Sequence, residues 1–131
     1  MPVFSTDLPS PSLTADEVSD LGGLTLRSRR TGDTQVIALA GELDIASVPD
    51  VEAELAGVEA TARLATLVLD LRGVTFIDSS GLRLILEASR RAETGAHRLA
   101  LLRPGERVFR AFEISGIDTL LPFEPAGDAN V

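Results

Sequence analysis

The sequence lacks four residue types: it contains no cysteine, no lysine, no tryptophan and no tyrosine, and His97 is its single histidine. Without cysteine, the chain cannot form disulfides, thiolate nucleophiles or cysteine-ligated zinc sites, which is compatible with a reducing compartment. Without lysine, it cannot carry the phosphate-binding loop G-x-x-x-x-G-K-[ST], so nucleotide hydrolysis by that route is excluded. We expect no bound cofactor.

The chain is acidic, with twenty acids against twelve basic residues and a net charge of −8. Nucleic-acid binders gain much of their affinity from basic surfaces that neutralise phosphates, so direct nucleic-acid binding is not expected. The N-terminus lacks a basic segment followed by an apolar stretch, and no run approaches the roughly 18 apolar residues of a membrane span. We expect a cytoplasmic protein without a membrane anchor.

The length of 131 residues fits one domain, whose core must be mostly aliphatic because only 4% of the residues are aromatic. Residues 1–23 contain three prolines, four acids and no arginine, and we expect a flexible tail. Within that tail, "TADEVSDLGG" has capping residues and apolar residues at helical spacing, which predict one or two helical turns. The folded domain is expected over residues 24–125, followed by a C-terminal tail at 126–131.

The folded part alternates strands and helices. Residues 24–30 and 34–41 flank a Gly-Asp turn at 32–33 and predict an antiparallel hairpin. Helices and strands then alternate, which predicts right-handed crossovers and an α/β fold with a mostly parallel mixed sheet. Helices are predicted from Ser47 to about Ala60, from Asp78 to about 95 and over 105–116, with strands at 65–73 and 97–102 and a short edge strand at 120–123.

Two loops, residues 40–47 and 75–81, follow strands and precede helices, where functional surfaces of such sheets tend to lie. In the second loop, Asp78, Ser79, Ser80 and Gly81 open a helix. These residues could be helix caps, an enzyme's nucleophile, or a modification site. A nucleophile is disfavoured because His97 lies at the opposite end of a predicted strand, and Asp44 with Asp78 makes only a weak metal site. We expect no catalytic activity.

A phosphate on Ser79 would be compatible with the fold. Unpaired backbone amides and the dipole at a helix start favour a negative group by about 0.3 to 1 kcal/mol. The group would add about −1.5 to −2 charges at one surface position. If an apolar or acidic partner docks there, desolvation and repulsion would weaken the complex, so the loop is suited to act as a switch.

Three segments together resemble the STAS domain family, specifically bacterial anti-sigma factor antagonists, over about residues 24–125. They are "AGELDIASVPDVEAEL" (40–55), "LVLDLRGVTFIDSSGLRLIL" (67–86) and "LRPGERVFRAFEISGIDTLLPF" (102–123). The motif D-S-S-G-L alone is a weak signal of this family. Its combination with G-E-L-D at this separation and with the final S-G-I-D segment makes the resemblance specific. It implies a single small domain with its helices mainly on one face of the sheet.

The resemblance also implies a function. An unphosphorylated antagonist binds an anti-sigma factor that is also a serine kinase, which frees a sigma factor for transcription in a stress response. The kinase phosphorylates Ser79 and switches binding off, and a metal-dependent serine phosphatase reverses the step. The implied partner-binding residues are Asp44, Asp78, Ser80, Gly81, Leu82 and Arg83.

Several alternatives stay open. Arg83 stands where the family often has a small residue, and it either pairs with an acid of the kinase or is a solvated helix residue. The domain could instead be a STAS subunit of a larger assembly, such as a lipid-transport ATPase complex or a stress-sensing particle, without phosphorylation control. The sequence names no particular sigma factor, kinase or phosphatase, and it leaves both a monomer and a homodimer open.

Overall fold

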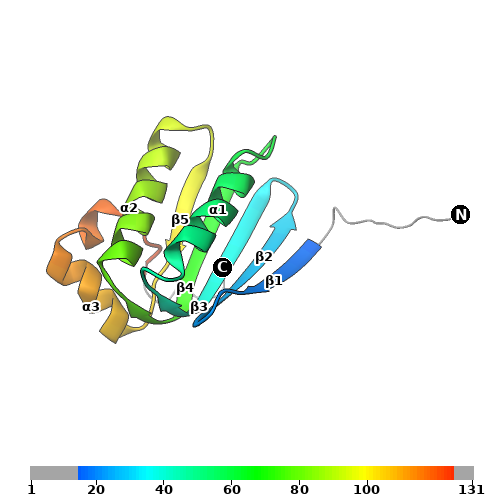
Figure 1. The fold of residues 1–131 in the computed structure, drawn as a ribbon. Coiled ribbons are helices and arrows are strands. Elements are labelled where there is room, and N and C mark those ends of the chain that lie inside the picture. The colour runs from blue at the N-terminus through cyan, green and yellow to red at the C-terminus, as the bar shows by residue number, and fades with distance from the viewer. Residues whose placement is uncertain (1–14, 126–131) are drawn as a thin grey trace, which may run out of the picture.

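The computed structural model describes residues 15–125, which form one mixed sheet with helices packed against it (Figure 1). The elements in chain order are β1 (Ala15–Asp20), β2 (Leu24–Thr31), β3 (Thr34–Leu43), α1 (Val48–Glu59), β4 (Thr66–Ile77), α2 (Ser79–Thr94), β5 (Arg98–Leu102), α3 (Glu106–Ser115) and the 3-10 helix η1 (Asp118–Leu120). None of the helices within 15–125 is long and apolar enough to cross a membrane.

The strands lie in the order β1-β2-β3-β4-β5. The pairings β1-β2 and β2-β3 are antiparallel, and β3-β4 and β4-β5 are parallel. The predicted hairpin turn at 32–33 is confirmed: Thr31 pairs with Thr34, and Gly32 has a φ of +62°. A positive φ at the first turn position suits the twist of a two-residue hairpin, and glycine adopts it without steric cost. The mixed sheet with helices between its parallel strands confirms the predicted α/β fold class.

The predicted helical turn before residue 23 is wrong, because Ala15–Asp20 forms the edge strand β1. The six residues pair with β2 from Ala15↔Arg30 to Asp20↔Thr25. Gly22, with a φ of +75°, lies in the connection between these strands, so the glycine pair belongs to a hairpin turn and ends no helix. The sheet thus begins inside the segment assigned to the tail, and antiparallel pairings equal the parallel ones. Residues 1–14 and 126–131 lie outside the described residues.

The predicted edge strand at 120–123 is also wrong. Residues 118–120 form the helix η1, and Phe123 makes a single parallel bridge with Leu101. Pro122 has no backbone N–H to extend a ladder, although its carbonyl oxygen accepts a bond from the Leu101 amide at 3.0 Å. The ring of Phe123 meets Phe109 and Phe112 edge-on, at centroid distances of 5.1 and 5.2 Å, so aromatic packing holds the segment.

The core lies between the sheet and the helices, of which α1 and α2 lie together in front of the sheet in Figure 1. It is mostly aliphatic, as the composition predicts, and α3 adds the fully buried Phe112. The most deeply buried side chains come from the sheet and both helices, including Ile37, Leu39, Val51, Leu55, Leu67, Leu69, Leu84 and Ile85. Alternate residues of β4 are buried, so the strand presents the intervening residues to the opposite face.

That opposite face carries an ion pair between Asp70 and Arg72 of β4. The guanidinium donates to both carboxylate oxygens at 2.9 Å. Burial raises the pKa of Asp70, but the hydrogen bonds and positive charge of Arg72 outweigh burial, so the pKa is lowered overall. Because Asp70 and Arg72 precede the carboxyl end of β4, they take no part in the loops discussed below.

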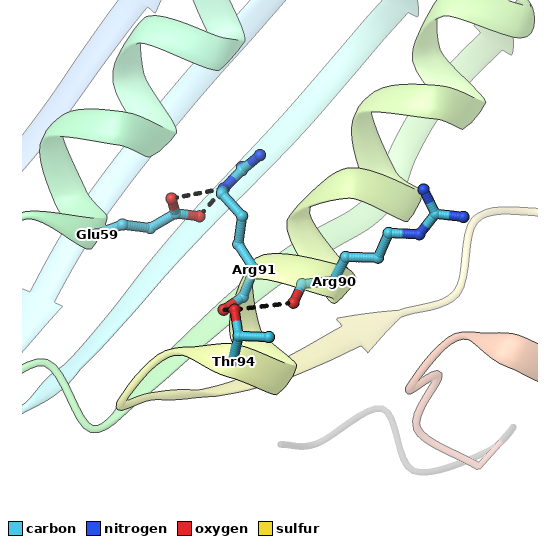
Figure 2. Close-up of polar contacts among 4 residues, drawn as sticks. All are labelled: Glu59, Arg90, Arg91 and Thr94. Carbon is cyan, nitrogen blue, oxygen red and sulfur yellow. Dashed lines mark hydrogen bonds and ion pairs between the residues drawn. The ribbon is translucent and has the colours of Figure 1, made fainter.

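A second ion pair joins the ends of α1 and α2. Arg91 donates to both carboxylate oxygens of Glu59, at 2.8 and 3.2 Å. Figure 2 shows the Arg91 side chain reaching toward Glu59, whereas the guanidinium of the neighbouring Arg90 points away from it. The arginine is 44% exposed and the glutamate 14%, so solvent screens the attraction in part. This pair helps to align the two helices.

We expect Arg91→Ala to lower the free energy of unfolding by about 0.5 kcal/mol, because a partly exposed bidentate pair is lost. Urea unfolding in low and high salt measures the effect, which shrinks as salt rises. Arg90→Ala is the matched control, since the Arg90 guanidinium contacts no carboxylate in the described part of the chain. Equal losses for both variants would contradict a role for the pair.

Candidate functional site

The two loops singled out in the sequence meet at one edge of the sheet. β3 and β4 are parallel neighbours, and their last residues, Leu43 and Ile77, are paired. The amide of Asp78 also donates to the carbonyl oxygen of Leu43 at 3.3 Å. Asp44 and Asp78 therefore lie at the carboxyl ends of adjacent strands. The loop predicted at 75–81 is wrong in its extent, because β4 continues to Ile77 and α2 starts at Ser79, which leaves Asp78 alone between them.

Asp78 is the N-cap of α2, and its carboxylate bonds to both loops. Its Oδ1 accepts from the amides of Ser80 at 2.9 Å and Gly81 at 3.2 Å. Its Oδ2 accepts from the amide of Ile45 at 3.1 Å. Charge-assisted bonds of this kind are stronger than those between neutral groups, so one side chain fixes the helix start and ties it to the other loop.

These bonds correct one expectation. The sequence predicted that amides at the start of α2 would be available to a negative group on Ser79. The Asp78 carboxylate already accepts from two of them and places its own negative charge there. A phosphate on Ser79 would therefore depend on other donors for stabilisation.

The two serines do not share the capping role of Asp78. Ser79 is exposed and Ser80 half-buried, and neither hydroxyl hydrogen-bonds to any residue between 15 and 125. The interpretation of this stretch as caps is thus right for Asp78 alone. The Ser79 hydroxyl is open to solvent at the first position of α2, where an incoming protein could reach it.

Asp44 stabilises its own loop. Its Oδ1 accepts from the amides of Ala46 at 3.0 Å and Ser47 at 3.2 Å. Ser47, predicted to cap α1, makes no cap bond and instead donates its hydroxyl to the carbonyl oxygen of Glu42 at 2.9 Å. The carboxylate of Asp44 is thus engaged within residues 42–47, and Asp78 alone of the two bonds across to the neighbouring loop.

Gly81 lets α2 start directly against the end of β3. A Cβ at this position would lie 2.6 Å from the carbonyl oxygen of Leu43 and 2.6 Å from Cγ1 of Ile77. Such distances do not occur in well-packed proteins, so any larger residue would push the helix away. The next residue, Leu82, is half-buried and packs against the core. Gly81 and Leu82 thus set the position of Ser79.

Three exposed side chains come from the two loops, the end of β4 and the start of α2. Arg83 is exposed and lines a cleft of about 320 Å³ with Ser79, Leu82, Leu86, Glu87, Arg90, Ser115 and Ile117. Ile45 is 74% exposed and Phe76 is 50% exposed. The sequence prediction missed Ile45 and Phe76. The position of Ile45 among the polar residues of "GELDIAS" is a sequence signal for its exposure. The exposure of Phe76 depends on the tertiary packing of the sheet and has no such signal.

The two carboxylates are engaged mainly with backbone amides. Within residues 15–125, no group of three or more acids and histidines could hold a metal ion. Asp78 uses both of its oxygens on backbone amides, and Asp44 uses Oδ1. The arrangement presents an exposed hydroxyl within a partly apolar face, which is suited to contact with another protein.

Comparison with known proteins agrees with this geometry. A family model described as "Mlab, STAS domain" matches residues 26–122. The chain is 36% identical over 87 residues to the anti-sigma F factor antagonist of Lysinibacillus sphaericus. The aligned region covers 66% of this chain and 74% of the relative.

Two solved structures have the same fold. The anti-sigma factor antagonist SpoIIAA in its unphosphorylated form is 28% identical with a TM-score of 0.62, covering 88% of this chain and 93% of the other. The Bacillus cell fate determinant SpoIIAA in the phosphorylated form is 27% identical with a TM-score of 0.57, covering 88% and 96%. Both forms of that protein thus resemble the present structure.

We expect Gly81→Ala to lower the free energy of unfolding by about 1 to 3 kcal/mol, because the methyl group would clash with the Leu43 carbonyl. Gly57→Ala is the matched control: Gly57 lies inside α1 with open space around its Cβ position, and alanine there should stabilise by about 0.5 to 1 kcal/mol. Denaturant unfolding of both variants measures the difference. A neutral Gly81→Ala would show that α2 can shift freely relative to β3.

Proposed function

The chain belongs to the STAS domain family, and from this we propose that it is an anti-sigma factor antagonist controlled by phosphorylation of Ser79. One observation carries the proposal: the Ser79 hydroxyl is exposed and free of hydrogen bonds to the described residues, directly after the capping carboxylate of Asp78. The similarity to anti-sigma factor antagonists supports the same role.

The partner is an anti-sigma factor that also acts as a serine kinase. The unphosphorylated antagonist binds it and releases the sigma factor. The binding face comprises the exposed side chains Ile45 and Phe76 with the start of α2 around Ser79 and Arg83. Two exposed apolar side chains beside a rigid helix start provide the kind of anchor that protein interfaces bury.

The kinase transfers the γ-phosphoryl group of ATP to Oγ of Ser79, releasing ADP and a proton. The product carries about −1.5 to −2 charges in the middle of the binding face. Burying that dianion beside Ile45 and next to the carboxylate of Asp78 costs several kcal/mol, so the complex dissociates. A metal-dependent serine phosphatase restores the hydroxyl and the binding form.

We expect incubation with the candidate anti-sigma factor kinase of the same genome and ATP to add one phosphate, which maps to Ser79 by peptide mass spectrometry. Ser79→Ala abolishes the modification, whereas Ser80→Ala, the adjacent control, leaves it. Ser79→Asp weakens binding to the kinase by at least tenfold, because a fixed charge then meets the interface. Modification of Ser80 with Ser79 untouched would falsify the assignment.

The apolar part of the face has its own test. Ile45→Ser should lower the affinity for the same kinase at least tenfold while leaving the melting temperature unchanged, since Ile45 is 74% exposed and contributes little to the core. Leu120→Ser is the control, because Leu120 is 64% exposed but lies on η1, outside the proposed face. Calorimetry gives both affinities. An equal loss for the control would assign the effect to general surface polarity.

A second candidate function is that of a STAS subunit held permanently in a larger assembly, because the matching family model is described as "Mlab, STAS domain" and does not name an antagonist. In that case the same face would dock without regulation. Copurification of a stable complex whose affinity is unchanged by Ser79→Asp would support this function over the first.

A further inference from the structure

A phosphate on Ser79 needs a cationic partner that the helix start does not supply. The Asp78 carboxylate accepts from the amides of Ser80 and Gly81, and its charge lies next to Ser79. Because like charges repel and the two amides are already engaged, the phosphate would turn away from Asp78. The direction that remains follows α2 toward the cleft, whose lining includes Ser79 itself.

We propose that Arg83 receives the phosphate of phosphorylated Ser79, a role that rests on the proposed function and deepens it. Arg83 follows Ser79 by four residues on α2, so the two side chains lie on one face with a rise of about 6 Å between their Cα atoms. Both line the same cleft. Arg83 is exposed, and its guanidinium contacts no carboxylate or carbonyl oxygen of the described residues.

The other cation of the cleft is too distant for this role. Arg90 follows Ser79 by eleven residues on the same helix, a rise of about 16 Å. The acid in the cleft, Glu87, would repel the phosphate and follows Arg83 by four residues. Arg83 is therefore the one cleft-lining residue that combines positive charge with reach to Ser79.

The pair would give phosphorylation a second effect on the binding face. The phosphate adds negative charge at Ser79, and by engaging Arg83 it also withdraws the cation nearest to that position from any acidic group of the partner. Arg83 is in this sense a positioning residue: it fixes where the phosphate lies without taking part in its transfer. The two effects act in the same direction, against binding.

The test uses protein carrying phosphoserine at position 79, incorporated during translation so that no kinase is needed. Titration by ³¹P NMR gives the second pKa of the phosphate, which is near 6 when unperturbed. We expect Arg83→Gln to raise this pKa by about 0.15 to 0.4 units relative to the otherwise unchanged protein, because loss of the guanidinium disfavours the dianion. Arg83→Lys should retain most of the lowering.

Arg90→Gln is the matched control and should shift the phosphate pKa by less than about 0.1 units, since Arg90 lies roughly two further turns along α2. Circular dichroism of each variant confirms that the fold is retained. Equal shifts for Arg83→Gln and Arg90→Gln, or no shift for either, would overturn the proposal. Because the phosphate is placed without the kinase, this result is independent of whether the kinase modifies Ser79.

Discussion

The site depends on the bonds made by one carboxylate. Asp78 accepts from two amides of α2 and from the amide of Ile45, and so joins the starts of two loops that are more than thirty residues apart in the chain. Gly81 lets α2 start close to the Leu43 carbonyl, where a larger residue would clash. A carboxylate with three donors is held in one orientation, and the residues bonded to it share that rigidity.

Because of this arrangement, Asp78 caps the helix and the Ser79 hydroxyl has no structural role at the helix start. If Ser79 were the cap, any modification of its hydroxyl would remove a bond on which the start of α2 depends. Because Asp78 carries that role, the Ser79 hydroxyl can change chemically while the helix keeps its start. A charged group can then be added to and removed from a fixed surface position without partial unfolding. A reversible switch at a protein interface requires this.

Local signals in the sequence were sufficient for most of the fold. The helices at 48–59, 79–94 and 106–115 were predicted because apolar spacing and capping residues are encoded within each segment. β1 was not predicted, because a glycine pair can end a helix or form a hairpin turn. Residues 15–20 form a strand because their backbone groups pair with the edge of β2. Such pairing with a distant segment cannot be predicted from the short segment itself.

The site was predictable in its position but not in its electrostatics. Alternating strands and helices place Asp44 and Asp78 at one sheet edge, yet whether amides at a helix start are free depends on where a carboxylate turns in three dimensions. Because Asp78 already accepts from the amides of Ser80 and Gly81, these two amides are not available to a negative group on Ser79. The fold therefore fixes the place of the exposed Ser79 hydroxyl, while exposed residues of α2 such as Arg83 are not constrained by the core.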